Sequence, residues 1–262
     1  MSFPLLRALA IAVLALPVAA LAAGSGIRIS EAGAESIGKK IWRNECAGTK
    51  DGLTSWNKGE DFASLGIGHF IWYPAGGRGP FHESFPELRD FLRAQGVDLP
   101  GWLAEAKACP WPDRASFMAD FNGPRLRGLR DILASTVGWQ ARFAALRLES
   151  ALPLMLQSAP AGQREKIRTN FYRVANAPGG LYALMDYVNF KGEGTSPSER
   201  YSGEGWGLLQ VLAGMSGGGS PTAAFAGSAD CVLTRRVDLS PSARGEKRWL
   251  PGWRNRVATY TN

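Results

Sequence analysis

The sequence predicts a predominantly helical α+β protein with one small β-hairpin. Three observations support this prediction. Apolar residues recur at spacings of three and four through most of the chain, as they do on one face of a helix. One turn-rich stretch interrupts this pattern, with glycines at positions 52, 59, 76 and 77. Hydrophobic residues make up 45% of the 262 residues, which excludes a disordered chain.

The N-terminal 22 residues have the pattern of a secretory signal peptide. Arg7 is their only charge, and the apolar run from Ala8 to Val18 is too short to span a bilayer. Ala20-Leu21-Ala22 offers a small-x-small cleavage site. We therefore expect a periplasmic or secreted protein that begins near residue 23 or 24, without an integral membrane anchor after cleavage. An uncleaved anchor is the alternative.

Residues 23–262 show no internal repeat and are expected to form a single domain with a sizeable core. The first helix is predicted to run from residue 30 or 31 to Glu45. Further helices are expected at 85–92, 114–121, 123–135, 138–158, 161–175, 179–189 and 208–215, separated by Pro or Gly. Ser216 to Ser220 is interpreted as a flexible loop.

The first helix carries the most informative acid. Ile37, Ile41 and Glu45 are four residues apart, so they lie on one helix face. A glutamate at the C-terminal end of a helix is unfavourable against the helix dipole, which favours a functional reason for its presence. An acid that projects from a helix end toward a glycine-rich hairpin is positioned to act as a general acid.

Composition limits the partners and cofactors. A net charge of +7 suits an anionic partner such as peptidoglycan, lipid head groups or nucleic acid, but the basic residues are scattered and do not choose among these. We expect no nucleic-acid partner. Three cysteines, at positions 46, 109 and 231, allow three alternative disulfides in an oxidising compartment. The chain has two histidines, so we expect neither a metal site nor a cofactor.

The segment from Asn44 to Tyr73 carries a recognisable pattern. Glu45 is followed by Ser64-Leu65-Gly66-Ile67-Gly68-His69. This resembles the lysozyme superfamily, most closely phage-type lysozymes, in which a catalytic glutamate ends the first helix and a hairpin precedes a Thr-x-Gly-x-Gly-His signature. Residues 252–260 look like the closing arginine-rich helix of that family. The resemblance implies a lysozyme-like fold with a small hairpin beside the catalytic helix, and cleavage of glycan strands.

The resemblance implies that Glu45 protonates the glycosidic oxygen, while a second group handles the water or the positive charge at the sugar carbon. The family's aspartate has no counterpart at the corresponding positions, Thr54 and Lys58. Our order of candidates for the second group is Glu60, then Asn57, then Asp61.

Strand alternation places Glu60 on the same face as Ser64, whereas Asp61 points to the other face. Ser64 would hold the attacking water, because it matches the threonine of the signature. His69 is expected to buttress the cleft by hydrogen bonding rather than to act as a catalyst.

A second polar and aromatic cluster lies in residues 187–210. Its glycines allow close approach of a ligand, and its polar groups suit sugar hydroxyls and amides. We predict that Asn189, Glu204, Trp206 and Gln210 contact substrate, with Glu204 or Glu193 as a reserve second carboxylate. The alternative is a surface loop without a binding role. Glu45 is expected on the floor of a groove between residues 53–72 and part of 187–210.

The functional prediction is an exported, monomeric glycoside hydrolase that cleaves peptidoglycan or a related amino-sugar polymer. One alternative is a lytic transglycosylase, in which the same glutamate acts first as acid and then as base while a hydroxyl of the sugar attacks. Another is a non-catalytic peptidoglycan-binding domain of the same fold. Chitin and chitosan are alternative substrates within the enzyme class.

Overall fold

The computed structural model describes residues 26–79 and 81–261. The predicted signal peptide lies outside these residues. The protein is 62% helical and 6% strand, so the prediction of a mainly helical molecule with a small antiparallel sheet is confirmed. Among the described residues, no helix combines the length and the apolar character needed to cross a membrane.

The first helix, α1 (Glu31–Cys46), matches its prediction and begins at an N-cap. The Ser30 side chain accepts a hydrogen bond from the Gly33 N–H at 3.0 Å, which satisfies one of the free donors of the first turn. The helix packs on α6 (Val137–Ser158). Gly38 permits this contact, because an added Cβ would lie 2.6 Å from the Val137 carbonyl oxygen.

The predicted hairpin is a three-stranded antiparallel sheet. Its strands are β1 (Thr54–Ser55), β2 (Ala63–Leu65) and β3 (Phe70–Trp72), paired in chain order. Leu65 pairs with both Thr54 and Phe70. The strands are short because turns occupy most of this stretch.

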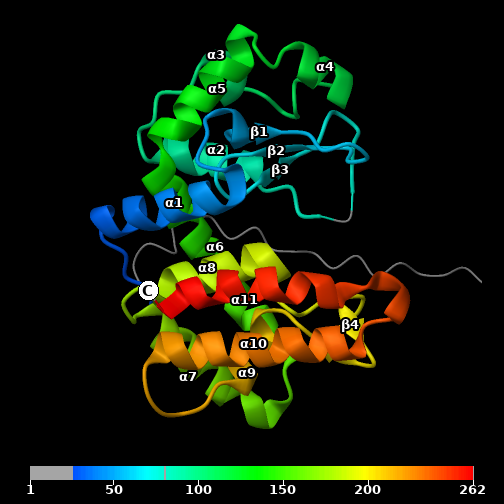
Figure 1. Cartoon of the computed structure of the whole chain (residues 1–262). Helices are drawn as coiled ribbons and strands as arrows, with labels where there is room; N and C mark the ends of the chain where they lie inside the picture. The colour runs from blue at the N-terminus through cyan, green and yellow to red at the C-terminus, as the bar shows by residue number, and fades with distance from the viewer. Residues whose placement is uncertain (1–25, 80, 262) are drawn as a thin grey trace, which may run out of the picture.

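Helix α6 connects two groups of helices, one above and one below in the view of Figure 1. The upper group surrounds the sheet and contains α2 (Phe85–Ala94), α3 (Gly101–Ala104), α4 (Arg114–Ala119) and α5 (Pro124–Ser135). The lower group contains α7 (Arg164–Ala175), α8 (Gly180–Lys191), α9 (Leu208–Gly214), α10 (Pro221–Leu239), α11 (Leu250–Ala258) and the two-stranded ribbon of β4 (Arg200–Tyr201) and β5 (Glu204–Gly205). The sequence patterns did not indicate α3, α10 or this ribbon.

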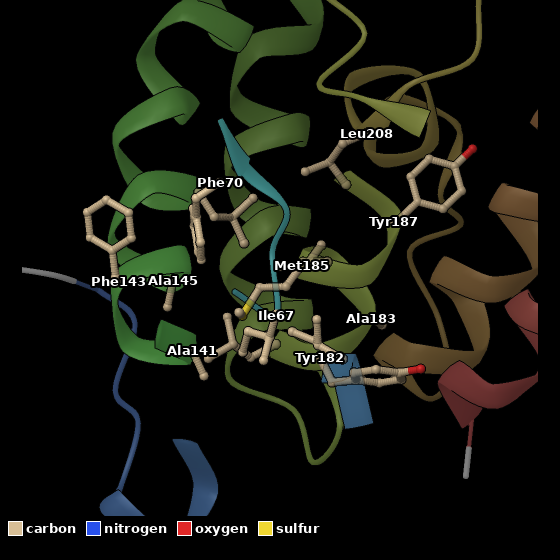
Figure 2. Close-up of a cluster of buried hydrophobic side chains, with 14 of the residues drawn as sticks. Ile67, Phe70, Ala141, Phe143, Ala145, Tyr182, Ala183, Met185, Tyr187 and Leu208 are labelled. Carbon is tan, nitrogen blue, oxygen red and sulfur yellow. The ribbon is translucent and has the colours of Figure 1, made fainter. Parts of the chain in front are cut away.

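A shared core connects the sheet with the lower helices. Figure 2 shows Ile67 and Phe70 from the sheet segment packed among side chains of α6 and α8, including Phe143 and Met185. These side chains are buried, and burial of large apolar groups is the main favourable term in folding. The sheet is therefore held against α6 and α8.

The turn between β2 and β3 is attached to α6 by one buried side chain. Gln140 is fully buried, and its Oε1 accepts a hydrogen bond from the Ile67 N–H at 3.0 Å. Its Nε2 donates to the Leu133 carbonyl at 2.6 Å. Gly66 has a φ of +73°, and an added Cβ would overlap the Gln140 Oε1. The turn therefore requires glycine at this position, and it carries His69 toward the end of α1.

Candidate functional site

Glu45 lies in the last turn of α1, where three distant segments meet. Its side chain is 16% exposed. One carboxylate oxygen accepts a hydrogen bond from Nη2 of Arg256 on α11, and the other lies 3.9 Å from Nδ1 of His69. The structure thus brings together Glu45 and His69, two of the residues that the sequence predicted.

A second carboxylate shares the same guanidinium. Asp186 on α8 has no exposed side-chain surface, and it accepts hydrogen bonds from Nε and Nη2 of Arg256 at 2.8 and 2.9 Å. The Tyr260 hydroxyl also donates to it at 2.7 Å, and Nδ2 of Asn44 donates at 3.2 Å. Arg256 therefore bridges a buried carboxylate and a partly exposed one.

This network fixes the charge of Arg256. Burial disfavours the guanidinium, but the hydrogen bonds from Arg256 to Asp186 and the charge of Glu45 outweigh burial and raise the pKa of Arg256. A cation is therefore always present beside Glu45. Asp186 alone accepts two hydrogen bonds from it, so the cation stays paired whatever the state of Glu45.

Cys46 completes a row with His69 and Glu45. Its Sγ lies 3.9 Å from Nε2 of His69 and 3.7 Å from the carbonyl oxygen of Gly66. Thiol hydrolases use such a cysteine, histidine and acid, but they need a thiolate. Burial, assisted by the charge of Glu45, raises the pKa of Cys46 to about 12, so the thiol stays protonated. The side chain therefore acts as a packing group in this structure, and all three cysteines are free.

The candidates for the second catalytic group lie apart from this network. Glu60 lies in the turn that precedes β2, so the strand alternation that we used to relate it to Ser64 does not apply. Its backbone carbonyl accepts a hydrogen bond from Trp56 at 2.7 Å, and its Oε2 is buried without a partner among the described residues. Asn57 is exposed, and its carbonyl accepts a hydrogen bond from the Glu60 N–H at 3.2 Å.

Ser64 is buried at the centre of the sheet, where it pairs with Ser55 and Ile71. Among the described residues, the Glu45 side chain makes polar contacts with Arg256 and His69, but not with Ser64 or Glu60. The structure does not bring the predicted second groups into contact with the acid.

Residues 187–210 divide between two places. Phe190 lies beside the site, with its ring centroid 4.5 Å from the guanidinium carbon of Arg256. Asn189 is exposed near the end of α8. The others belong to the β4–β5 ribbon and the start of α9, where the surroundings of Trp206 include Tyr201 and Arg236.

Two of the predicted substrate contacts have partners within the protein. Oε1 of Gln210 accepts a hydrogen bond from the Gly207 N–H at 2.9 Å, and its Nε2 donates to the Gly194 carbonyl at 3.0 Å. Glu204 is exposed and forms an ion pair with Arg235 at 3.3 Å. Gln210 thus caps α9 with its amide, a role that strand and turn patterns did not indicate.

Sequence reasoning missed Asn44, Asp186 and Arg256 as site residues. One signal could have identified Asp186, because it is the only charged residue in the apolar run from Leu181 to Phe190. A buried acid requires a partner of opposite charge or several hydrogen-bond donors. Arg256 lies in the C-terminal segment that resembles the closing helix of lysozymes.

One well-defined cavity lies away from Glu45. Its volume is about 830 Å³, and it is lined by the N-terminal ends of α1 and α10 and by the turn that precedes α8. Its lining residues do not include Glu45. No group of three or more His, Cys, Asp or Glu in the described part of the chain is arranged to hold a metal ion.

No protein-family model matches this chain, and searches of curated proteins and of solved structures found no match.

Proposed function

We propose that the protein is an exported glycosidase with a lysozyme-like fold that cleaves the glycan strands of peptidoglycan. The observation that carries this proposal is the position of Glu45. A mostly buried carboxyl group lies at a helix end, beside a histidine from the sheet segment and an arginine from the C-terminal helix. A carboxyl group that is fixed at a helix end and keeps some exposure can exchange a proton with a glycosidic oxygen.

The shared arginine supports both states of the acid. When Glu45 is protonated, Asp186 keeps Arg256 paired, so no buried cation is left without a counter-charge. When Glu45 has given its proton to the leaving oxygen, Arg256 stabilises the carboxylate that remains. Glu45 can therefore lose and regain a proton without breaking the network.

Hydrolysis also requires a group that activates water, and we propose Glu60, Asn57 and Ser64 for this role.

One observation favours the lytic transglycosylase as a second candidate. Asp186 is the other carboxylate in the network, and it is fully buried and hydrogen-bonded to three side chains. A single accessible acid suits a mechanism in which Glu45 acts as acid and then as base.

The test is digestion of purified peptidoglycan with the wild-type protein, followed by mass analysis of the products. Reducing ends support the hydrolase, and anhydro-sugar ends support the transglycosylase. Parallel digests of chitin and chitosan test the alternative polymers. Sacculi that bind the protein but stay intact would reject both enzymatic functions and leave a binding domain.

A further inference from the structure

The cavity away from Glu45 lies where three segments of the chain meet. It is lined by one face of α1, by the turn that precedes α8 and by the first residues of α10. In Figure 1 these segments lie on the left side of the view, next to the C-terminus. Ligand pockets in proteins commonly have volumes of about 300–1,000 Å³, and this cavity has about 830 Å³. It is therefore large enough for a small organic molecule.

Several polar side chains that line this cavity are free to bind a ligand. Four of them form no hydrogen bond or ion pair within the described part of the chain: Arg28, Ser36, Lys40 and Asn176. All four can donate hydrogen bonds. The Nζ of Lys40 lies 5.2 Å from the ring centroid of Tyr182, which also lines the cavity. This contact places the ammonium group at the cavity wall.

The charged groups of the lining are all positive. No Asp or Glu is among the described residues that line the cavity. The nearby acid Glu35 pairs with Lys39 at 3.1 Å and not with Lys40. Lys and Arg side chains are charged at neutral pH, and a cleft lined by one sign of charge attracts ligands of the opposite sign. The cavity is therefore complementary to an anion.

Apolar side chains line the same cavity. Ile29 and Ile37 are half-buried, and Pro178 is exposed. A single inorganic ion would leave this apolar surface in contact with water, whereas a ligand with an apolar part would cover it. The Tyr182 hydroxyl is already engaged, because it accepts a hydrogen bond from Nδ2 of Asn44 at 2.7 Å. The free groups therefore suit a ligand with one acidic end and one apolar end.

We propose that this cavity is a binding site for a small organic anion that has an apolar part, such as a fatty acid or an alkyl phosphate. Lys40 and Arg28 bind the acid group, and the apolar part lies against Ile29 and Ile37. Glu45 does not line the cavity, so the site is separate from the candidate acid. The proposal does not depend on the proposed function.

The experiment titrates the wild-type protein with two fluorescent probes. Anilinonaphthalene sulfonate is an aromatic anion whose fluorescence rises in apolar surroundings, and N-phenylnaphthylamine has the same rings without the sulfonate. We expect the anionic probe to bind at one site, about tenfold more tightly than the neutral probe, because the anion alone pairs with the cations.

Three variants test the parts of the site. Lys40→Met and Arg28→Gln should each weaken binding of the anionic probe about tenfold and leave binding of the neutral probe unchanged. Arg28 is exposed and precedes α1, so its replacement tests the charge even if Lys40→Met alters folding. Ser36 is also exposed, and Ser36→Phe should weaken binding of both probes because the larger side chain fills the cavity.

A matched control is Lys39→Met. It removes the same charge from the neighbouring position of α1, but Lys39 is not among the residues that line the cavity. Binding of the anionic probe should therefore stay at the wild-type level. Glu45→Gln should also leave it unchanged, since the two sites are separate.

Competition experiments decide what the site accepts. Displacement of the anionic probe by octyl phosphate, but not by inorganic phosphate at the same concentration, would support the proposal. Equal displacement by both would reject it in favour of a simple ion site. Unchanged affinity in both Lys40→Met and Arg28→Gln would also reject it. Binding to phosphatidylglycerol vesicles that requires Arg28 and Lys40, without displacement of the probe by octyl phosphate, would reject it in favour of a membrane surface.

Discussion

Glu45 and Asp186 share one arginine, yet their surroundings fit them for different tasks. Asp186 is closed off from solvent and accepts hydrogen bonds from three side chains, so it anchors Arg256. Glu45 keeps an exposed edge and a single strong partner. The difference between two carboxylates on one guanidinium makes the more accessible one the candidate acid.

The first prediction concerns Glu45. We expect Glu45→Gln to lower glycan cleavage by at least about 10²–10⁴-fold, because an amide cannot donate a proton of suitable acidity. The melting temperature and the binding of sacculi should barely change. Glu35→Gln on the same helix is the control. Glu35 has an exposed side chain that pairs with Lys39 at 3.1 Å, so its replacement should leave activity unchanged. Wild-type activity in Glu45→Gln would contradict the assignment.

The second prediction concerns the stability contributed by Lys191. Its pKa is lowered from 10.5 to about 7 in the folded protein, chiefly by burial and by Arg236. Between these values the unfolded chain binds more protons, so the free energy of unfolding should rise with pH from about 7 to 10.5. Below this window Lys191 is charged in the folded protein, so the full cost of burying its charge lowers the free energy of unfolding. The contacts of its ammonium group with the Phe190 and Trp253 rings offset part of this cost.

We therefore expect Lys191→Met to stabilise the protein at pH 6, with the gain shrinking toward pH 10. Urea unfolding at several pH values measures this difference. Lys39→Met, at an exposed position on α1, is the control and should show no such dependence. A gain that is the same at every pH would contradict the lowered pKa.

At the scale of elements, most helices could be predicted because their apolar residues follow one face. The longest miss, α10, contains many small residues, and its apolar side chains are spread around the helix. Its buried residues do follow one face, but three of its exposed positions, 223, 227 and 231, are Ala, Gly and Cys, so the sequence shows no clear polar face. The strands of the β4–β5 ribbon have two residues each, too few for alternation to be read.

The turn between β2 and β3 gives the third prediction. Gly66→Ala should destabilise the protein, because it adds a left-handed φ strain of about 1–3 kcal/mol and an overlap with Gln140. Gly59→Ala is the matched control. Its φ is +88°, but an added Cβ meets no atom within 4 Å, so strain alone remains. Thermal unfolding should show the larger loss for Gly66→Ala, and equal losses would contradict the role of Gln140.

At the scale of the whole molecule, the site could be predicted only where its parts are close in sequence. Glu45 and His69 belong to one signature, and their proximity was implied by it. Arg256 lies 211 residues from Glu45, and no local pattern relates two such positions. Asp186 and Arg256 meet because α8 and α11 pack in the same lower group of helices, which is a property of the fold.

The fourth prediction tests this long-range link. Asp186→Asn should lower the free energy of unfolding by about 3–5 kcal/mol, because it removes one partner of a buried ion pair. Asp230→Asn is the control, because Asp230 on α10 pairs with Arg254 of α11, the helix that also carries Arg256, and both side chains are well exposed. Its cost should be about 0–1 kcal/mol. Similar losses in urea unfolding would contradict the anchoring role of Asp186.

The distance along the chain between Glu45 and Arg256 also sets an order of events during synthesis. Glu45 and His69 can meet early, because the loop between them is short. Asp186 can bind Arg256 only after that residue has been synthesised. Until then the carboxylates of Glu45 and Asp186 lack the cation that they share in the folded protein. The contacts around Glu45 are therefore complete only when the chain up to Arg256 is available to fold.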